Sequence, residues 1–218
     1  MRKIKVPTIG EKTKLQKMGF EAIEILRSGQ LIICPTENSY VVIADPQSEI
    51  GTQAFVTIKG HDLTTTYPVF VNSVDDLIGL VLGINDKARL LVQQFWPGLL
   101  NLQFLTRENL PHNFGGESPP DRLIARKPKS PLINVITELM GPVIYSSLMD
   151  SSKKPIKDLE NLNAAQRKLV TVAFDGGAIK GKKITTIVSS SHNSIQVLRE
   201  GSISTWELKQ LVSDIKEV

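Results

Sequence analysis

Three short polar segments follow apolar stretches of the chain and hold many of the side chains suited to chemistry. They cover residues 35–39, 59–62 and 146–152. Ligands of open α/β sheets bind in loops at strand ends, so these segments are the expected binding loops. Lys59 is a flexible point charge that can reach a phosphate. A lysine at the C-terminus of a helix is the alternative interpretation of the same position.

Two arginines stand where apolar strand patterns end. Arg126 precedes a lysine and a proline, and Arg199 precedes a glutamate and a glycine. An arginine at a strand end can fork onto a phosphate or a carboxylate. A surface ion pair is the alternative for both residues.

Metal and nucleotide-loop motifs of the common kinds are missing from the sequence. The three histidines, His61, His112 and His192, lie far apart and have no cysteine partners. We therefore predict no zinc site and no protein metal ligands. No glycine-rich loop of the Walker type occurs either, so any bound nucleotide would need another kind of site.

Alternating strand and helix patterns must position these residues. Helical periodicity covers 11–27, 49–58, 86–95 and 132–140, with further helix starts at Ser73 and Ser204. Strand patterns cover 31–34, 40–44, 67–71, 100–105, 122–126, 143–146, 170–174, 184–188 and 195–198. Several connections are too short for a crossover helix, so we expect one α/β domain with a twisted mixed sheet flanked by helices. Residues 1–10 show no period and are predicted as an N-terminal arm before a domain spanning 11–218.

Composition fits a globular protein and gives no sign of a membrane protein. The apolar fraction is 41% and the charged fraction 22%. No apolar run approaches the roughly 18 residues that a membrane span needs, and no signal core follows the basic N-terminus. The single cysteine, Cys34, excludes an internal disulfide and reads as a buried apolar residue. We expect a cytoplasmic protein without membrane contact.

Positive charge is concentrated in two stretches, although the net charge is only +4. Residues 151–183 contain eight lysines and arginines against three acidic residues, and residues 1–17 contain six against one. Such patches can meet phosphates, free or in a nucleic acid. A solvated surface is the alternative.

The loops and strands together resemble the YrdC-like family, which has the threonylcarbamoyl-AMP synthase fold. The segments that carry the resemblance are P-T-E-N-S-Y at 35–40, I-K-G-H at 58–61, P-V-F-V at 68–71, F-W-P-G at 95–98, R-K-P at 126–128, S-S-L-M at 146–149, D-G-G at 175–177, T-T-I-V at 185–188 and L-R-E-G at 198–201. They occur in the family's order from about residue 20 to about residue 205. F-W-P-G is the most specific of them.

The resemblance implies a fold, a reaction and roles for particular residues. It implies a basic concave cleft and a nucleotidyltransferase that makes threonylcarbamoyl-AMP from threonine, bicarbonate and ATP with magnesium, for tRNA modification. ATP with Mg²⁺ would be a substrate, with no permanently bound cofactor. By the same resemblance, Thr36 and Lys59 would be catalytic, whereas Tyr40, His61, Arg126, Ser147 and Arg199 would bind substrate or nucleotide.

Several positions depart from the family's pattern. His61 and Asp62 replace an arginine and a proline, Asn38 replaces a threonine, Val41 replaces a glycine, and Met149 replaces an asparagine. The S-L-M spelling resembles the YciO branch of the family, whereas F-W-P-G resembles the synthases. A catalytically altered YciO-like paralogue that binds nucleotide or double-stranded RNA is therefore the alternative function.

Overall fold

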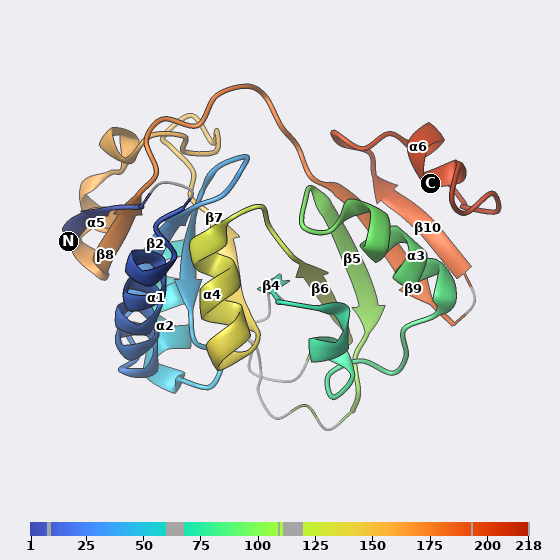
Figure 1. The fold of residues 1–218 in the computed structure, drawn as a ribbon, viewed down its shortest axis with the longest axis horizontal. Coiled ribbons are helices and arrows are strands. Elements are labelled where there is room, and N and C mark those ends of the chain that lie inside the picture. Colours follow the sequence, from blue (N-terminus) through green and yellow to red (C-terminus); the bar gives the residue numbers. More distant parts are fainter. Residues whose placement is uncertain (8–9, 60–67, 109, 111–119, 193, 218) are drawn as a thin grey trace.

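The computed structural model describes residues 1–7, 10–59, 68–108, 110, 120–192 and 194–217. Within this part, one ten-stranded mixed sheet runs in the order β1-β8-β2-β3-β7-β4-β6-β5-β9-β10 (Figure 1). The strands are β1 Arg2–Lys5, β2 Leu31–Pro35, β3 Tyr40–Ala44, β4 Val69–Phe70, β5 Leu100–Leu105, β6 Arg122–Arg126, β7 Val143–Ser147, β8 Val170–Asp175, β9 Thr186–Ser191 and β10 Ser194–Arg199. The helices are α1 Lys12–Arg27, α2 Glu49–Lys59, α3 Asp86–Phe95, α4 Pro131–Met140, α5 Ala164–Leu169 and α6 Thr205–Lys209, with 3₁₀ turns η1 Val74–Leu77 and η2 Leu159–Asn161.

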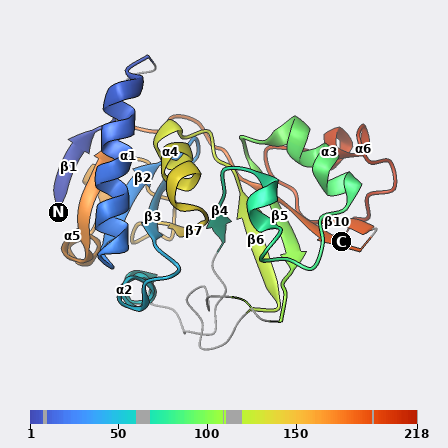
Figure 2. The same ribbon diagram turned by 60° about the horizontal axis from the view of Figure 1, so that its bottom comes forward.

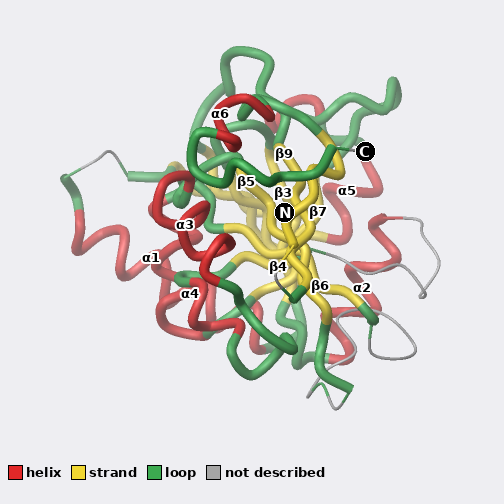
Figure 3. Tube along the Cα trace, turned by 90° about the vertical axis from the view of Figure 1, so that its right-hand side faces the viewer, coloured by secondary structure: helices red, strands yellow, loops and turns green. Residues whose placement is uncertain are grey.

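Helices cover both faces of the sheet around β2, β3 and β7. Helices α1 and α4 lie on one side of the strand layer, and α2 and α5 lie on the other (Figure 3). Strand alternation explains this arrangement, because Ile32 and Cys34 of β2 join the α1/α4 core whereas Leu31 and Ile33 join the opposite core. A strand buried on both faces is apolar throughout, as β2 is.

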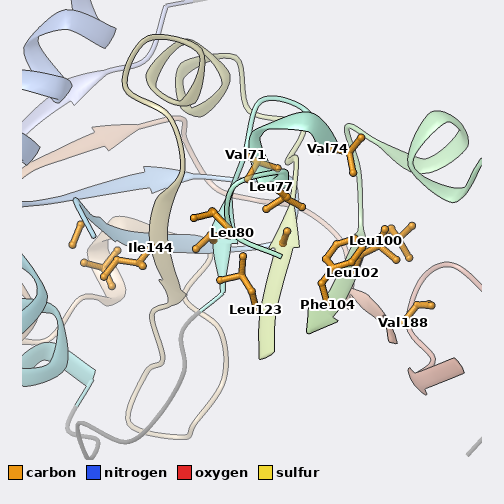
Figure 4. Close-up of a cluster of buried hydrophobic side chains, with 14 of the residues drawn as sticks. Val71, Val74, Leu77, Leu80, Leu100, Leu102, Phe104, Leu123, Ile144 and Val188 are labelled. Atoms are coloured by element: carbon orange, nitrogen blue, oxygen red, sulfur yellow. The ribbon is translucent and has the colours of Figure 1, made fainter. Parts of the chain in front are cut away.

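The short strand β4 separates the sheet into two halves. The first half contains β1, β8, β2, β3 and β7, and the second half contains β6, β5, β9 and β10. Figure 2 shows β4 between them, and it pairs with both β6 and β7. One apolar cluster crosses this join, running from Ile144 in the first half to Leu102 and Val188 in the second (Figure 4). The two halves therefore share one core.

Strand β5 places apolar side chains on one face of the second half of the sheet and polar side chains on the other. Leu100, Leu102 and Phe104 are fully buried in the shared core, together with side chains of α3 and η1. Asn101 and Gln103 alternate with them and point to the opposite face. Polar side chains of the second half therefore gather on the face that α1 and α4 cover in the first half.

The expected architecture is confirmed, with local differences. The predicted helices and the mixed sheet are present, but β9 begins at Thr186 rather than at Ile184. β1, α5 and η2 were not predicted. No helix among the described residues has the length and apolar character that crossing a membrane requires.

Candidate functional site

Thr36 shapes the loop between β2 and β3, which we call the 36–39 loop. Its hydroxyl donates to the carbonyl oxygen of Ser39 at 2.7 Å and accepts from the Ser39 amide at 3.2 Å. It also lies 2.9 Å from Oδ1 of Asn38. Thr36 is buried, so its hydroxyl holds the loop in a tight turn in this structure.

Arg126, the last residue of β6, binds this loop from the other half of the sheet. Its Nε donates to the Gly98 carbonyl at 2.7 Å, and both Nη atoms donate to Asn38 Oδ1 at 3.2 Å. The guanidinium lies 6.0 Å from the ring centroid of Phe70, and Arg126 is only 1% exposed. A charge buried to this extent needs a counter-charge.

Glu37 supplies that counter-charge. Its Oε1 lies 2.8 Å from Nη2 of Arg126, and the Glu37 side chain is 10% exposed. This contact is ionic and lacks the direction of a hydrogen bond. The other oxygen, Oε2, accepts from the Lys129 amide at 3.2 Å. Glu37 therefore joins the 36–39 loop to the segment that follows β6.

Ser147 brings the end of β7 to the same loop. Its hydroxyl lies 3.3 Å from the hydroxyl of Ser39. Two residues later Met149 is 40% exposed, and its carbonyl accepts from Gln166 Nε2 at 3.0 Å. The segment after Ser147 thus presents the Met149 thioether at the position where the pattern given in the sequence analysis has an asparagine.

Tyr40 connects β3 to the turn after β8. Its hydroxyl donates to the Gly177 carbonyl at 2.8 Å and accepts from the Gly176 amide at 3.0 Å. Burial raises the pKa of Tyr40 to about 12, which favours the protonated hydroxyl even more than its ordinary pKa does. A Cβ atom at Gly176 would lie 2.8 Å from the ring of Pro35, and glycine is what permits this close approach.

Arg199, at the end of β10, is held by the residue that precedes β9. Its Nη2 donates to the Thr185 carbonyl at 2.9 Å and to the Thr185 hydroxyl at 2.7 Å, and Nε donates to the same carbonyl at 3.2 Å. Thr185 is buried whereas Arg199 is exposed. The exposed guanidinium is therefore fixed on one side by a buried partner.

Buried polar contacts continue inward from Thr185. Asn101 Nδ2 donates to the Thr185 hydroxyl at 3.2 Å, and the Tyr145 hydroxyl donates to Asn101 Oδ1 at 3.3 Å. The Tyr145 ring stacks on Phe70 with centroids 3.5 Å apart. Burial raises the pKa of Tyr145, and the nearby charges of Arg126 and Arg199 oppose this rise. Both arginines thus lie close enough to act on one hydroxyl.

The structure brings together most of the residues that the sequence singled out. Thr36, Arg126 and Ser147 meet around the 36–39 loop, and Arg199 joins them through the contacts just described. Tyr40 lies beside the loop but points to the turn after β8. Lys59 ends α2, and its side chain lies outside the described residues, as do His61 and Asp62.

Sequence reasoning did not single out Glu37, Asn101, Tyr145 or Thr185 as interacting residues. Asn101 carried a signal, since an amide within the apolar run Leu100–Leu105 indicates a buried polar contact. Within the described residues, no three histidine, cysteine or acidic side chains gather as metal ligands would. Hydroxyls and guanidinium groups dominate the site, and these bind oxyanions.

Comparison with known proteins shows which proteins this chain is similar to. A family model described as Sua5_yciO_yrdC, telomere recombination, matches residues 24–201. A putative threonylcarbamoyl-AMP synthase of Mycobacterium tuberculosis is 28% identical over 191 residues, which cover 88% of this chain and 87% of the relative. The YciO protein of Escherichia coli, described as uncharacterized, is 25% identical over 206 residues, covering 85% of this chain and 90% of that protein.

Solved structures share the fold. Sua5 of Pyrococcus abyssi in complex with L-threonine matches 100% of this chain with a TM-score of 0.82 at 21% identity. The present chain spans only 62% of that Sua5 chain. YciO of E. coli matches 92% of this chain and 95% of its own, with a TM-score of 0.73 at 21% identity.

Proposed function

Because this chain belongs to the Sua5/YciO/YrdC family, we propose that it is a threonylcarbamoyl-AMP synthase that condenses threonine, bicarbonate and ATP. The threonine amine and bicarbonate form a carbamate with loss of water, and a carbamate oxygen then attacks the α-phosphorus of ATP and expels pyrophosphate. The product would serve the threonylcarbamoyladenosine modification of tRNA, a reaction expected in the cytoplasm. The relatives named threonylcarbamoyl-AMP synthase support the reaction, and the Sua5 complex supports threonine as the amino acid.

One observation carries the proposal. The 36–39 loop contacts the ends of two strands that lie far from it in sequence, through Asn38 with Arg126 and through Ser39 with Ser147. Hydroxyl and guanidinium groups from three segments therefore converge on one place. A reaction between an amino acid, bicarbonate and a nucleotide requires such convergence, because its rate depends on alignment and on stabilised phosphate charge.

Roles for the individual residues follow from their placement and from the family pattern. We propose that Thr36 shapes the amino-acid side of the site and that Ser147 hydrogen-bonds a phosphate. Lys59 and His61 would hold phosphate oxygens, and Arg199 would close over the nucleotide. Arg126 would supply positive charge and fix the 36–39 loop, and Tyr40 would support that loop from behind.

Magnesium would enter as the ATP complex. Its charge would neutralise the polyphosphate and assist the departure of pyrophosphate. The Ser147 hydroxyl is only partly buried and could contact a phosphate oxygen, whereas the fully buried Ser39 hydroxyl, 3.3 Å away, would hold it in place. We assign no side chain as a metal ligand.

Pyrophosphate release from ATP, measured with bicarbonate and magnesium, tests the function directly. We expect release to depend on threonine and to fall at least about 100-fold in Ser147→Ala combined with Arg199→Ala, since each loses a hydrogen bond to a charged group. The same protein without threonine is the control. ATP binding without threonine-dependent release would contradict the synthase proposal.

Met149 favours a second candidate, a YciO-like protein that binds nucleotide or double-stranded RNA without synthase turnover. Its side chain is 40% exposed and offers no hydrogen-bond donor next to Ser147. RNA bound through the basic stretches would lose affinity steeply as salt rises and would not require threonine. A binding titration of double-stranded RNA at two salt concentrations distinguishes this candidate from the synthase.

A further inference from the structure

Arg199 offers a ligand only part of its guanidinium. Its Nε and Nη2 donate to the carbonyl and hydroxyl of Thr185, whereas Nη1 has no hydrogen-bond partner among the described residues. An arginine has five N–H groups, so the bonds to Thr185 leave the two N–H groups of Nη1 for a bound oxyanion. The position of Thr185 therefore sets the direction in which Arg199 faces.

Thr185 is itself held from behind by Asn101. Its hydroxyl oxygen accepts from Asn101 Nδ2 at 3.2 Å and from Arg199 Nη2 at 2.7 Å. A hydroxyl has two acceptor lone pairs, and these two bonds occupy both. The rotation of the Thr185 side chain is thereby fixed by one buried donor and one exposed donor.

Tyr145 fixes the orientation of the Asn101 amide. Its hydroxyl donates to Asn101 Oδ1 at 3.3 Å, which directs Nδ2 toward Thr185. If the amide were flipped, its oxygen would face Thr185 and would draw the Thr185 proton, which would turn the lone pairs away from Arg199. Asn101 and Tyr145 are 6% and 5% exposed, so water does not readily substitute for either bond.

Strand order explains why the contacts must pass through these side chains. Tyr145 lies on β7, Asn101 lies on β5, and β4 and β6 separate the two strands in the sheet. The Tyr145 ring stacks against Phe70 of β4, and its hydroxyl reaches Asn101 of β5. The chain of contacts thus crosses from the first half of the sheet to the second.

We infer that Tyr145 and Asn101 are positioning residues that hold Arg199, through Thr185, in the orientation in which it binds the nucleotide. This inference rests on the proposed function, because it assigns Arg199 to the nucleotide. Neither residue touches the ligand in this scheme. The effect of Asn101 on binding must therefore disappear when the Arg199 side chain is removed.

A double-mutant cycle in ATP affinity, measured by calorimetry with magnesium, tests the inference. We expect Asn101→Leu to weaken ATP binding about 3- to 10-fold, the effect of one neutral hydrogen bond. In an Arg199→Ala background the same substitution should change affinity less than about twofold. Equal weakening in both backgrounds, or none in either, overturns the inference.

A second pair of variants separates positioning from folding. Asn101→Leu removes the acceptor of the buried Tyr145 hydroxyl proton, whereas Asn101→Leu with Tyr145→Phe removes both polar partners. We expect the double variant to regain much of the lost stability while its ATP affinity stays about 3- to 10-fold weak. Asn85→Leu is the matched control, since Asn85 also uses both ends of its amide but lies at the start of α3. Its ATP affinity should not change.

A ligand-free measurement distinguishes failure of the inference from failure of the proposed function. If the wild-type protein binds no ATP, the proposed function is wrong. The free energy of unfolding is then measured for the same four proteins of the double-mutant cycle. The inference is supported if the effects of Asn101→Leu and Arg199→Ala on the folding equilibrium constant depart from additivity by at least about threefold. Such coupling would show that Asn101 and Arg199 interact through Thr185. Additive effects overturn the inference.

Discussion

The buried charge of Arg126 requires particular partners around it. Its guanidinium is removed from water, donates hydrogen bonds to Gly98 and Asn38, and forms an ion pair with Glu37. Two of these three partners lie in the 36–39 loop, so the loop conformation and the Arg126 charge depend on each other. The cost of burying both ions is high, which makes loss of one partner more serious than loss of the pair.

Glu37→Gln should therefore destabilise the protein. The substitution leaves the buried guanidinium without a counter-charge, and we expect a loss of about 3 kcal/mol in the free energy of unfolding. Urea unfolding of the two proteins gives the difference. Glu160→Gln is the control, because Glu160 pairs with Lys3 on the surface and should change stability by less than about 0.5 kcal/mol. Similar values for both variants would contradict the prediction.

Asn38 gives a physical reason for one departure from the family pattern. An amide oxygen can accept from both Nη atoms of Arg126, and the structure shows both contacts at 3.2 Å. Asn38 thus ties the 36–39 loop to the end of β6.

The turn between α3 and β5 acts at the scale of elements. The Trp96 indole donates to the Leu100 carbonyl at 2.8 Å, and the Gly98 amide donates to the Lys127 carbonyl at 2.8 Å. The Gly98 carbonyl accepts from Arg126. This turn thus joins α3 to the end of β6, and its Gly98 carbonyl is one of the hydrogen-bond acceptors of Arg126. The F-W-P-G segment forms most of this turn.

Gly98→Ala should disturb this turn. A Cβ atom at Gly98 would lie 2.3 Å from the Phe95 carbonyl oxygen, so the backbone must move. We expect a loss of at least about 2 kcal/mol in stability and a weaker hold on Arg126. Gly79→Ala is the matched control, because its Cβ would meet no atom within 4 Å. Equal urea midpoints for the two variants would show that the turn can relax.

The sequence predicted those elements whose own residues specify them. α1, α3 and α4 carry a full apolar periodicity, and the capping box before α6 is visible as Ser204 and Glu207. β1 carries one isoleucine among three cations, so it becomes a strand only by pairing with β8. The strand predicted at 67–71 is present as β4, but only Val69–Phe70 belong to it.

The site was predictable only as a set of segments. Resemblance selected Thr36, Arg126, Ser147 and Arg199, but it could not give their partners. Asn38 and Arg126 are 88 positions apart, and Asn101 and Thr185 are 84 apart. Such contacts arise from strand order, which local patterns do not specify. Lys59 and His61 remain predictions from the family pattern.

At the scale of the molecule, the two halves of the sheet should unfold together. β4 is a narrow connection, yet the apolar cluster around Leu102 and Ile144 and the contacts from Tyr145 to Asn101 both cross it. Separate unfolding of one half would expose this shared core. Cooperative unfolding is therefore expected, with one transition.

Two spectroscopic signals can test this expectation because they report on different halves. Trp96 and Trp206 lie at α3 and α6 beside the second half, whereas the longest helix, α1, packs on the first. We expect tryptophan fluorescence and far-ultraviolet circular dichroism to give coincident urea transitions. Transitions that differ by more than about 0.5 M in midpoint would indicate independent halves.

The two outer strands of the sheet, β1 and β10, determine whether copies of the protein can aggregate by pairing strands at high concentration. An open strand edge is a template for aggregation. On β1 three of the four residues are cations, so a second copy would bring like charges together. On β10 the backbone of Lys216 already occupies the free amide of Val197 and the carbonyl of Ile195. One edge repels and the other is covered, so fibre-like growth through strand addition is disfavoured at both.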